Sequence, residues 1–258
     1  MNNKAIGIFD SGLGGLTVVK EIIKVMPYED IVYLGDTARV PYGTRSKETI
    51  IKFSFEDANF LLQKNIKCLI IACNTSSALA GAELKKKLEI LVFDVITPAL
   101  KEAKEISKSG KIGVIGTRGT IGSGAYSVPF SKACPLFVPF IEEGETEGDA
   151  IEIVAKNYLA DFKKDNIDTL ILGCTHYPII KDVIKREVNN DVKLIDPGKA
   201  VAKEILEYLN ENKMLNVQET KGKKDYFVTD LTERFTKVAE MFLGEKIQDK
   251  LKKVVLTK

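Results

Sequence analysis

The hydrophobic residues of this chain fall into short continuous runs, separated by longer segments with helical periodicity. The run at 5–9 reads AIGIF and the run at 68–72 reads CLIIA, whereas apolar side chains recur every three or four residues at 16–25. Continuous apolar runs are typical of parallel strands that are covered by helices on both faces. Because strand and helix patterns alternate, the sequence predicts an α/β fold with doubly wound, mostly parallel sheets.

The pattern predicts an ordered series of elements. The predicted strands are 5–9, 31–34, 68–72, 91–95, 111–115, 136–140, 169–172, 193–195 and 225–229. The predicted helices are 16–25, 47–64, 74–88, 148–162, 177–188 and 231–243, and 116–124 is expected to be a loop.

Two pairs of segments indicate that the pattern occurs twice. IGIFDSGLGG at 6–15 resembles IGVIGTRGTI at 112–121, and LIIACNTSSAL at 69–79 resembles LILGCTHYPII at 170–180. The members of these pairs are 106 and 101 residues apart, a difference of about one loop. We therefore predict two similar α/β lobes with a site between them. The first lobe would comprise 1–96 plus 209–258 and the second 97–208; chance similarity of two strand–loop segments is the alternative.

Composition narrows the class of protein. The chain has 258 residues, of which 45% are apolar, so global disorder is disfavoured. It carries 38 Lys and Arg against 36 Asp and Glu, a balance that disfavours nucleic-acid binding driven by net charge. No apolar run approaches the roughly 20 residues that span a bilayer. Four cysteines are too few for a disulfide scaffold, so we expect a cytoplasmic protein with no membrane or nucleic-acid partner.

Two of the four cysteines are candidates for chemistry. Cys73 and Cys174 each follow a predicted strand and precede a predicted helix. Ligands bind at the carboxyl ends of parallel strands, and a helix N-terminus lowers the pKa of a thiol. Cys68 and Cys134 lack polar neighbours of this kind and are expected to pack in the core. Burial as inert apolar side chains is the alternative for Cys73 and Cys174 as well.

The only histidine, His176, lies two residues after Cys174. Histidine exchanges protons near neutral pH and can hold a neighbouring thiol as thiolate, although a purely structural hydrogen bond is the alternative. A zinc site is disfavoured because the chain has no C-x-x-C pair. The glycine-rich segment 10–16 lacks both the G-x-G-x-x-G spacing and the Walker lysine, so a nucleotide site is also disfavoured.

Five motifs together resemble the glutamate racemase family, in the order in which that family has them. They are DSGLGGL at 10–16, GDTARVPYG at 35–43, IACNT at 71–75, CPLFVPFIEEG at 134–144 and LGCTHYP at 172–178. The resemblance implies an isomerase that interconverts L- and D-glutamate without a cofactor or metal. It further implies a supply of D-glutamate for peptidoglycan and, commonly, a homodimer.

The resemblance also implies roles for individual residues. Cys73 would take the α-proton of D-glutamate and Cys174 that of L-glutamate, and Asp10, His176 and Glu142 would assist them. Glu142 is favoured over Glu143 as the site carboxylate, and Asp36 would orient the Cys73 side. The residues implied to contact substrate are Asp10, Ser11, Tyr42, Gly43, Asn74, Thr75, Thr175 and His176.

Two other functions stay open at this point. Aspartate racemases resemble this chain at the two cysteine motifs but less over 35–43, so aspartate or another small acidic amino acid is an alternative substrate. A non-catalytic amino-acid-binding module with inert cysteines is the alternative of a different class.

Overall fold

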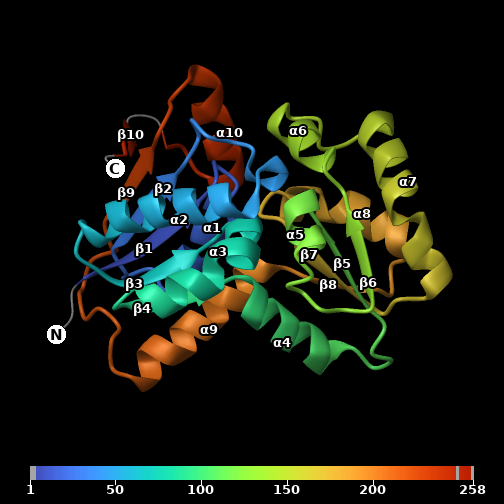
Figure 1. The fold of residues 1–258 in the computed structure, drawn as a ribbon, viewed down its shortest axis with the longest axis horizontal. Coiled ribbons are helices and arrows are strands. Elements are labelled where there is room, and N and C mark those ends of the chain that lie inside the picture. The colour runs from blue at the N-terminus through green and yellow to red at the C-terminus, as the bar shows by residue number, and fades with distance from the viewer. Residues whose placement is uncertain (1–3, 248–249, 257–258) are drawn as a thin grey trace.

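The computed structural model, which describes residues 4–247 and 250–256, contains two parallel sheets, one in each of two lobes (Figure 1). The first sheet has the order β10-β9-β2-β1-β3-β4 and the second has the order β6-β5-β7-β8. The strands of the first are β1 Ala5–Asp10, β2 Ile31–Gly35, β3 Ile66–Ile71, β4 Leu91–Asp94, β9 Lys224–Val228 and β10 Leu251–Lys253. Those of the second are β5 Ile112–Gly116, β6 Phe130–Ala133, β7 Thr169–Gly173 and β8 Lys193–Ile195. The predicted α/β fold class is confirmed.

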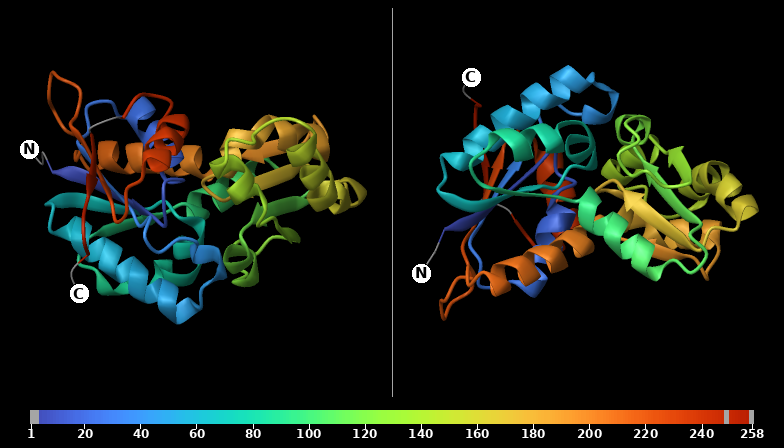
Figure 2. Two further views of the ribbon diagram at one scale, coloured as in Figure 1. Left: turned by 90° about the horizontal axis from the view of Figure 1, so that it is seen from above. Right: turned by 60° about the horizontal axis from the view of Figure 1, so that its bottom comes forward.

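Helices cover both faces of each sheet (Figure 2). In the first lobe α1, α9 and α10 lie on one face and α2 and α3 on the other; in the second, α7 and α8 lie opposite α4 and α5. The α-helices are α1 Leu16–Val25, α2 Lys47–Leu62, α3 Asn74–Lys87, α4 Ile96–Ile106, α5 Arg118–Gly122, α6 Phe137–Glu142, α7 Asp149–Asp165, α8 Lys181–Val188, α9 Pro197–Glu211 and α10 Glu233–Leu243. Two 3₁₀ turns are η1 Tyr42–Thr44 and η2 Tyr177–Ile180.

Strand β1 shows why continuous apolar runs produce this architecture. Ile6 and Ile8 pack in the cluster under α1 and α9, whereas Phe9 points to the opposite face and packs with residues of α2 and α3. All three side chains are fully buried. Each such burial contributes about 1.5–3 kcal/mol to the free energy of unfolding, which is available only where both faces of the strand are covered.

The order of the strands reflects the internal similarity of the two halves. The arrangement β2-β1-β3-β4 in the first sheet corresponds to β6-β5-β7-β8 in the second. The matched segments of the sequence contain β1 and β5, and β3 and β7, which occupy equivalent central positions. Residue 73, after β3, and residue 174, after β7, therefore lie at equivalent ends of the two sheets.

One predicted strand is wrong. The segment 136–140 lies in helix α6, and the edge strand of the second sheet is β6 at 130–133 instead. Phe137 and Ile141, four residues apart, are both fully buried, as one face of a helix requires. Pro139 is the third residue of that helix, where a missing N–H costs no intrahelical hydrogen bond.

Other elements were missing from the prediction. Helix α5 occupies the predicted loop 116–124, because the Thr117 hydroxyl caps it by accepting a hydrogen bond from the Thr120 N–H at 3.2 Å. Helices α4 and α9 and the short strand β10 were not predicted. Most of the remaining boundaries agree with the prediction within two residues.

The chain passes between the lobes at two places, and an aspartate stands at each. Asp94 accepts hydrogen bonds from the N–H groups of Ile96 and Thr97, both at 2.8 Å, where β4 leads into α4. Asp196 accepts one from Gly198 at 2.9 Å, where β8 leads into α9. Helix α9 then packs against α1 and also contacts α4. Since α9 contacts both lobes, the predicted division at 96/97 and 208/209 stays a prediction.

In the described part of the chain, no helix combines the length and the apolar character that a bilayer crossing requires.

Candidate active site

A cavity of about 360 Å³ lies between the lobes, where β1, β3 and β7 end. Side chains from both lobes line it, as expected for open parallel sheets. The first lobe contributes residues 11–12, 40–44 and 73–75, and the second contributes residues 117–118, 135, 138–139, 142 and 174–176. Both candidate cysteines therefore face one space, whereas Cys68 and Cys134 are buried elsewhere and do not line it.

Cys73 is the residue at which β3 gives way to α3. Its Sγ accepts a hydrogen bond from the Ser76 N–H at 3.5 Å and lies 3.5 Å from the Ser11 hydroxyl. Burial, reinforced by the nearby Asp10, raises the pKa of the thiol to about 11. The hydrogen bond from the helix N-terminus at Ser76 lowers this pKa as predicted, but desolvation of the thiolate outweighs it, so the net prediction of a lowered pKa is wrong.

Cys174 follows β7 and has a different set of partners. Its side chain is buried, and its Sγ lies 3.8 Å from Nδ1 of His176. The chain turns sharply here, since the Cys174 N–H bonds to the Leu172 carbonyl at 2.7 Å. This turn aims the sulfur into the cavity beside the imidazole.

His176 lies between a thiol and a carboxylate. Its Nε2 is 3.0 Å from Oε1 of Glu142, and the ring of Phe242 packs edge-on against it at 5.0 Å. Burial lowers the pKa of His176, but the hydrogen bonds with Cys174 and Glu142 raise it by more, so that the pKa rises from 6.5 to about 10. The imidazole is therefore charged at neutral pH, and it can hold a proton next to Cys174.

The structure distinguishes the two candidate glutamates. Glu142 lines the cavity and contacts His176, and this hydrogen bond lowers the pKa of the carboxyl although burial opposes it. Glu143 points away and forms an exposed ion pair with Arg234, at 2.6 Å. The favoured residue, Glu142, is the one brought to the site.

Asp10 ends β1 and lies beneath the Cys73 side of the cavity rather than in its lining. Its Oδ2 accepts a hydrogen bond from the Gly12 N–H at 3.0 Å, while Oδ1, which is buried, has no partner among the described residues. Burial raises the pKa of this carboxyl, an effect that the nearby His176 only partly offsets. Asp10 is therefore poised to accept a further hydrogen bond or a proton.

The glycine-rich loop after β1 allows the lobes to approach closely. A Cβ on Gly14 would lie 2.3 Å from Oγ1 of Thr175 and 2.6 Å from Nδ1 of His176. Next to it, the Thr17 hydroxyl donates a hydrogen bond to the Thr175 carbonyl at 2.8 Å. The loop thus serves contact between the lobes, which agrees with the absence of nucleotide-binding spacing.

A group of three threonine hydroxyls at the cavity was not predicted in full. Thr75 of the first lobe lies 3.0 Å from Thr117 of the second, and Thr117 lies 3.1 Å from Thr120. Only Thr75 was predicted as a substrate contact. The internal similarity contained the missing signal, because the matched segments 6–15 and 112–121 align Ser11 with Thr117.

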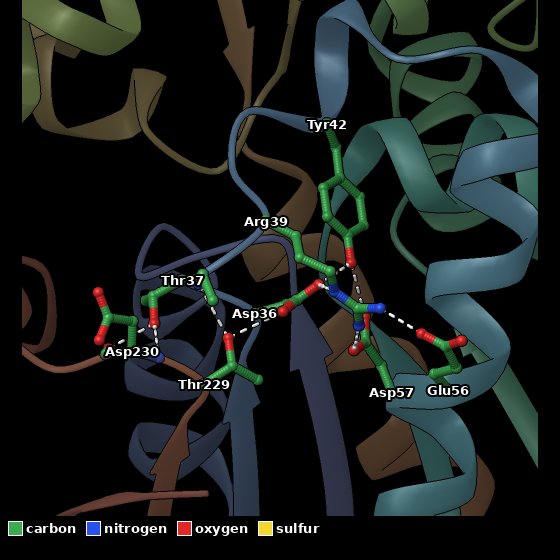
Figure 3. Close-up of polar contacts among 9 residues, drawn as sticks. Asp36, Thr37, Arg39, Tyr42, Glu56, Asp57, Thr229 and Asp230 are labelled. Carbon is green, nitrogen blue, oxygen red and sulfur yellow. Dashed lines mark hydrogen bonds and ion pairs between the residues drawn. The ribbon is translucent and has the colours of Figure 1, made fainter. Parts of the chain in front are cut away.

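Tyr42 and Gly43 line the cavity from the turn η1. Asp36 lies against the hydroxyl of Tyr42 (Figure 3). The Tyr42 hydroxyl donates to Oδ2 of Asp36 and lies 3.0 Å from Oδ2 of Asp57. Asp36 is fully buried and does not line the cavity. Its contact with the predicted Cys73 side runs through Tyr42, whose ring packs in one cluster with Cys73.

The remaining predicted residues also line the cavity. Asn74, at the start of α3, accepts a hydrogen bond from the Tyr126 hydroxyl through Oδ1 at 2.5 Å, which leaves its amide N–H groups free to turn toward the cavity. Thr175 lies between Cys174 and His176. Within residues 4–247 and 250–256, no cluster of three or more His, Cys, Asp or Glu side chains is arranged to hold a metal ion.

Comparisons of sequence and of structure with known proteins all find racemases. Residues 15–205 match the family model of the Asp/Glu/hydantoin racemases. The chain is 46% identical to the glutamate racemase of Geobacter metallireducens and 47% identical to that of Aquifex aeolicus; each alignment covers 95% of this chain, and 95% and 96% of those proteins, respectively. It is also similar to the crystal structure of Francisella tularensis glutamate racemase in complex with D-glutamate, with a TM-score of 0.92, 44% identity and 99% coverage of both chains.

Proposed function

The chain belongs to the Asp/Glu/hydantoin racemase family, among its glutamate racemases, and on that premise we propose that it interconverts L- and D-glutamate by two-base transfer of the α-proton. The observation that carries the proposal is the presence of Cys73 and Cys174, from equivalent strand ends of two lobes, in one cavity. Racemisation needs one group on each face of the α-carbon, and two lobes can supply one each.

The proposed reaction moves one proton out and another in. With D-glutamate bound, the Cys73 thiolate takes the α-proton, so that an S–H bond forms and the C–H bond breaks. The electron pair stays on the α-carbon and its carboxylate. The Cys174 thiol then gives its proton to the opposite face and becomes the thiolate, which starts the reverse reaction.

The neighbours of each cysteine suit its task. The Asp10 carboxyl beside Cys73 can accept the proton of that thiol, and His176 beside Cys174 can stabilise a thiolate as the imidazolium. Polar groups of Ser11, Asn74, Thr75, Thr117 and Thr175 line the cavity between the two thiols. Such fixed dipoles can stabilise the carbanion that forms when the weakly acidic α-proton leaves.

Glutamate is proposed as the substrate because relatives with at least 44% identity that cover nearly the whole chain are named glutamate racemases. Aspartate is the competing substrate. Circular dichroism of both amino acids at a fixed protein concentration separates them: faster loss of the aspartate signal would overturn the glutamate assignment.

The decisive experiment follows α-proton exchange of L- and D-glutamate in D₂O by NMR, with wild type, Cys73→Ser and Cys174→Ser. The two-base mechanism requires that each substitution abolish racemisation. Near-normal turnover by either variant would exclude the mechanism, and a wild-type protein that binds glutamate without any exchange would identify a non-catalytic binding module. The supply of D-glutamate for peptidoglycan, a cytoplasmic location and a homodimer stay predictions beyond this test.

A further inference from the structure

A cluster of charged side chains, two of them fully buried, lies beside the hydroxyl of Tyr42, whose side chain lines the cavity (Figure 3). Asp36, at the end of β2, and Asp57, on α2, are both fully buried. Arg39 donates from Nε to Oδ2 of Asp36 at 2.5 Å and from Nη2 to Oδ1 of Asp57 at 3.0 Å. Arg39 also pairs with Glu56 through Nη1. The cluster thus places three carboxyl groups around one guanidinium.

The hydrogen bonds at Tyr42 require a second proton. The phenol oxygen is within hydrogen-bond distance of Oδ2 of Asp36 and of Oδ2 of Asp57. A phenol has one proton and can donate to only one of two carboxylates. If both were ionised, one carboxylate oxygen would face a phenol lone pair in a site closed to water. One of the two carboxyl groups must therefore donate to Tyr42.

The partners of Asp36 show that it is the acceptor. Its Oδ2 faces the Arg39 Nε–H as well as Tyr42. Its Oδ1 accepts a hydrogen bond from the Thr229 hydroxyl at 2.8 Å, and the Thr229 oxygen in turn accepts one from the Ala38 N–H at 2.9 Å. Both oxygens of Asp36 thus face donors, and a proton on either would meet another proton.

Asp57 has the complementary arrangement. Its Oδ1 accepts from Arg39, whereas Oδ2 faces, among the described residues, only the Tyr42 oxygen. A proton on Oδ2 would complete a chain in which Asp57 donates to Tyr42 and Tyr42 donates to Asp36. The charges agree: among the described residues these carboxyl groups pair with one cation, Arg39, which already faces Asp36 and Glu56, so ionisation of Asp57 would add a third negative charge around one guanidinium. Burial, followed by Asp36, raises the pKa of Asp57 well above its ordinary value.

We propose that Asp57 is a neutral carboxylic acid that donates a hydrogen bond from Oδ2 to Tyr42, and that this bond positions the segment 41–44 at the substrate cavity. The segment is also held by the packing of the Tyr42 ring with Ile50, Phe53 and Cys73. Its Gly43 packs against Thr117 of the second lobe, where an added Cβ would come within 2.7 Å of the Thr117 Cβ. Displacement of the Tyr42 ring would therefore disturb both the cavity wall and a contact between the lobes.

The test compares two substitutions of similar size. Asp57→Asn retains a donor toward Tyr42 and an acceptor toward Arg39, whereas Asp57→Leu removes both. We expect Asp57→Asn to leave the KM for glutamate within about twofold of wild type, and Asp57→Leu to raise it about tenfold, with a smaller effect on kcat. An Asp57→Asn variant as impaired as Asp57→Leu would show that the carboxylate charge is needed, and would overturn the proposal.

A spectroscopic measurement decides the protonation independently of activity. The infrared spectrum of the ligand-free protein at pH 7 should contain the carbonyl stretch of a neutral carboxylic acid that Asp57→Asn abolishes. Tyr42→Phe is the second variant if Asp57→Leu does not fold. In Tyr42→Phe the same band should shift, because the carboxylic acid loses the phenol oxygen that accepts its hydrogen bond. No band difference between wild type and Asp57→Asn would overturn the proposal. The KM comparison rests on the proposed racemase function, but the band does not, so failure of either is recognised separately.

Discussion

The Sγ atom of Cys174 lies 3.8 Å from Nδ1 of His176, whereas the sulfur of Cys73 lies 3.5 Å from the hydroxyl of Ser11. Two cysteines at equivalent strand ends thus have unlike partners: an imidazole on one side, and a serine with a buried aspartate on the other. The two halves of the cavity resemble each other in backbone position, so the proposed mechanism predicts that the two thiols exchange protons with different neighbours. Several measurable differences result.

The adjacent glutamates form a matched pair. Glu142→Gln removes the carboxylate that bonds to His176, and we expect kcat to fall about tenfold because the imidazolium loses a charge-assisted hydrogen bond. Glu143→Gln, which breaks only an exposed ion pair with Arg234, should leave kcat within about twofold. Steady-state kinetics of both variants checks this. A larger loss in Glu143→Gln would identify the wrong carboxylate.

Stability should depend on pH through His176. Its pKa is raised from 6.5 to about 10 on folding, so between these values the folded state binds more protons than the unfolded state. This contribution to stability is complete below about pH 6.5 and is lost as the pH rises through about 10. Urea denaturation from pH 6 to 10 should show wild type losing stability relative to His176→Asn. A difference between the two proteins that is constant with pH would contradict the pKa.

Activity should rise with pH because of Cys73. Its thiol, with a pKa of about 11, is mostly protonated at neutral pH, and only the thiolate can act as the base. Between pH 7 and 9, kcat/KM for D-glutamate should therefore increase about tenfold per unit, as the thiolate fraction does. Initial rates in buffers of constant ionic strength measure this. A flat profile over this range would contradict a pKa of about 11 for this thiol, because kcat/KM reports the ionisations of the free enzyme.

The glycine-rich loop offers a test of lobe contact. Gly14→Ala would place a methyl group 2.3 Å from Oγ1 of Thr175, so the segment carrying Cys174 must shift. Since small displacements of reacting groups are costly, we expect kcat/KM to fall about 100-fold. Gly122→Ala is the control, because an added Cβ there meets no atom within 4 Å. Equal activity of the two variants would show that the lobes adjust freely.

The buried ion pair between Lys67 and Glu29 should contribute more to the free energy of unfolding than an exposed pair does. Lys67 on β3 lies 2.5 Å from Oε2 of Glu29, and both side chains are buried. Lys67→Met leaves that carboxylate unpaired and should lower the free energy of unfolding by about 3–5 kcal/mol. Lys252→Met, which breaks an exposed pair with Asp225, should cost less than about 1 kcal/mol. Urea denaturation of both variants compares the two losses directly.

The sequence predicted the central strands well because their apolar runs are buried on both faces, a property that the pattern records. It did not predict α6, where Phe137 and Ile141 have helical spacing but stand in a short apolar segment that Pro139 interrupts. The aspartates at 94 and 196 mark passages between lobes, and the helices α4 and α9 that follow them were missed. Helix α9 begins with an Asp196 N-cap followed by Pro197, and α4 has Asp94 just before its N-cap and Pro98 in its first turn. The prediction did not use these start signals.

The candidate site shows a similar division. Strand-end residues such as Cys73 and His176 could be predicted, because parallel strands bring their ends to one edge. The raised pKa of Cys73 could not, since it depends on how deeply the folded chain buries the sulfur. Asp57 lies mid-helix, 15 residues from Tyr42, with no local signal of the contact. The sequence therefore could not predict pKa shifts and side-chain contacts that depend on burial in the folded chain.

The two aspartate-capped passages at 94–97 and 196–198 also restrict how the lobes can move. The two connections define a hinge axis, and we expect rotation of one lobe about that axis to cost the least energy. Twisting or sliding of the lobes would strain the chain at one of the connections. We expect the span between the two sulfur atoms to vary with a single angle. Since even a Cβ on Gly14 would lie 2.3 Å from Oγ1 of Thr175, we expect the glycine loop to limit closure of the lobes and so to set the shortest distance between the two sulfur atoms.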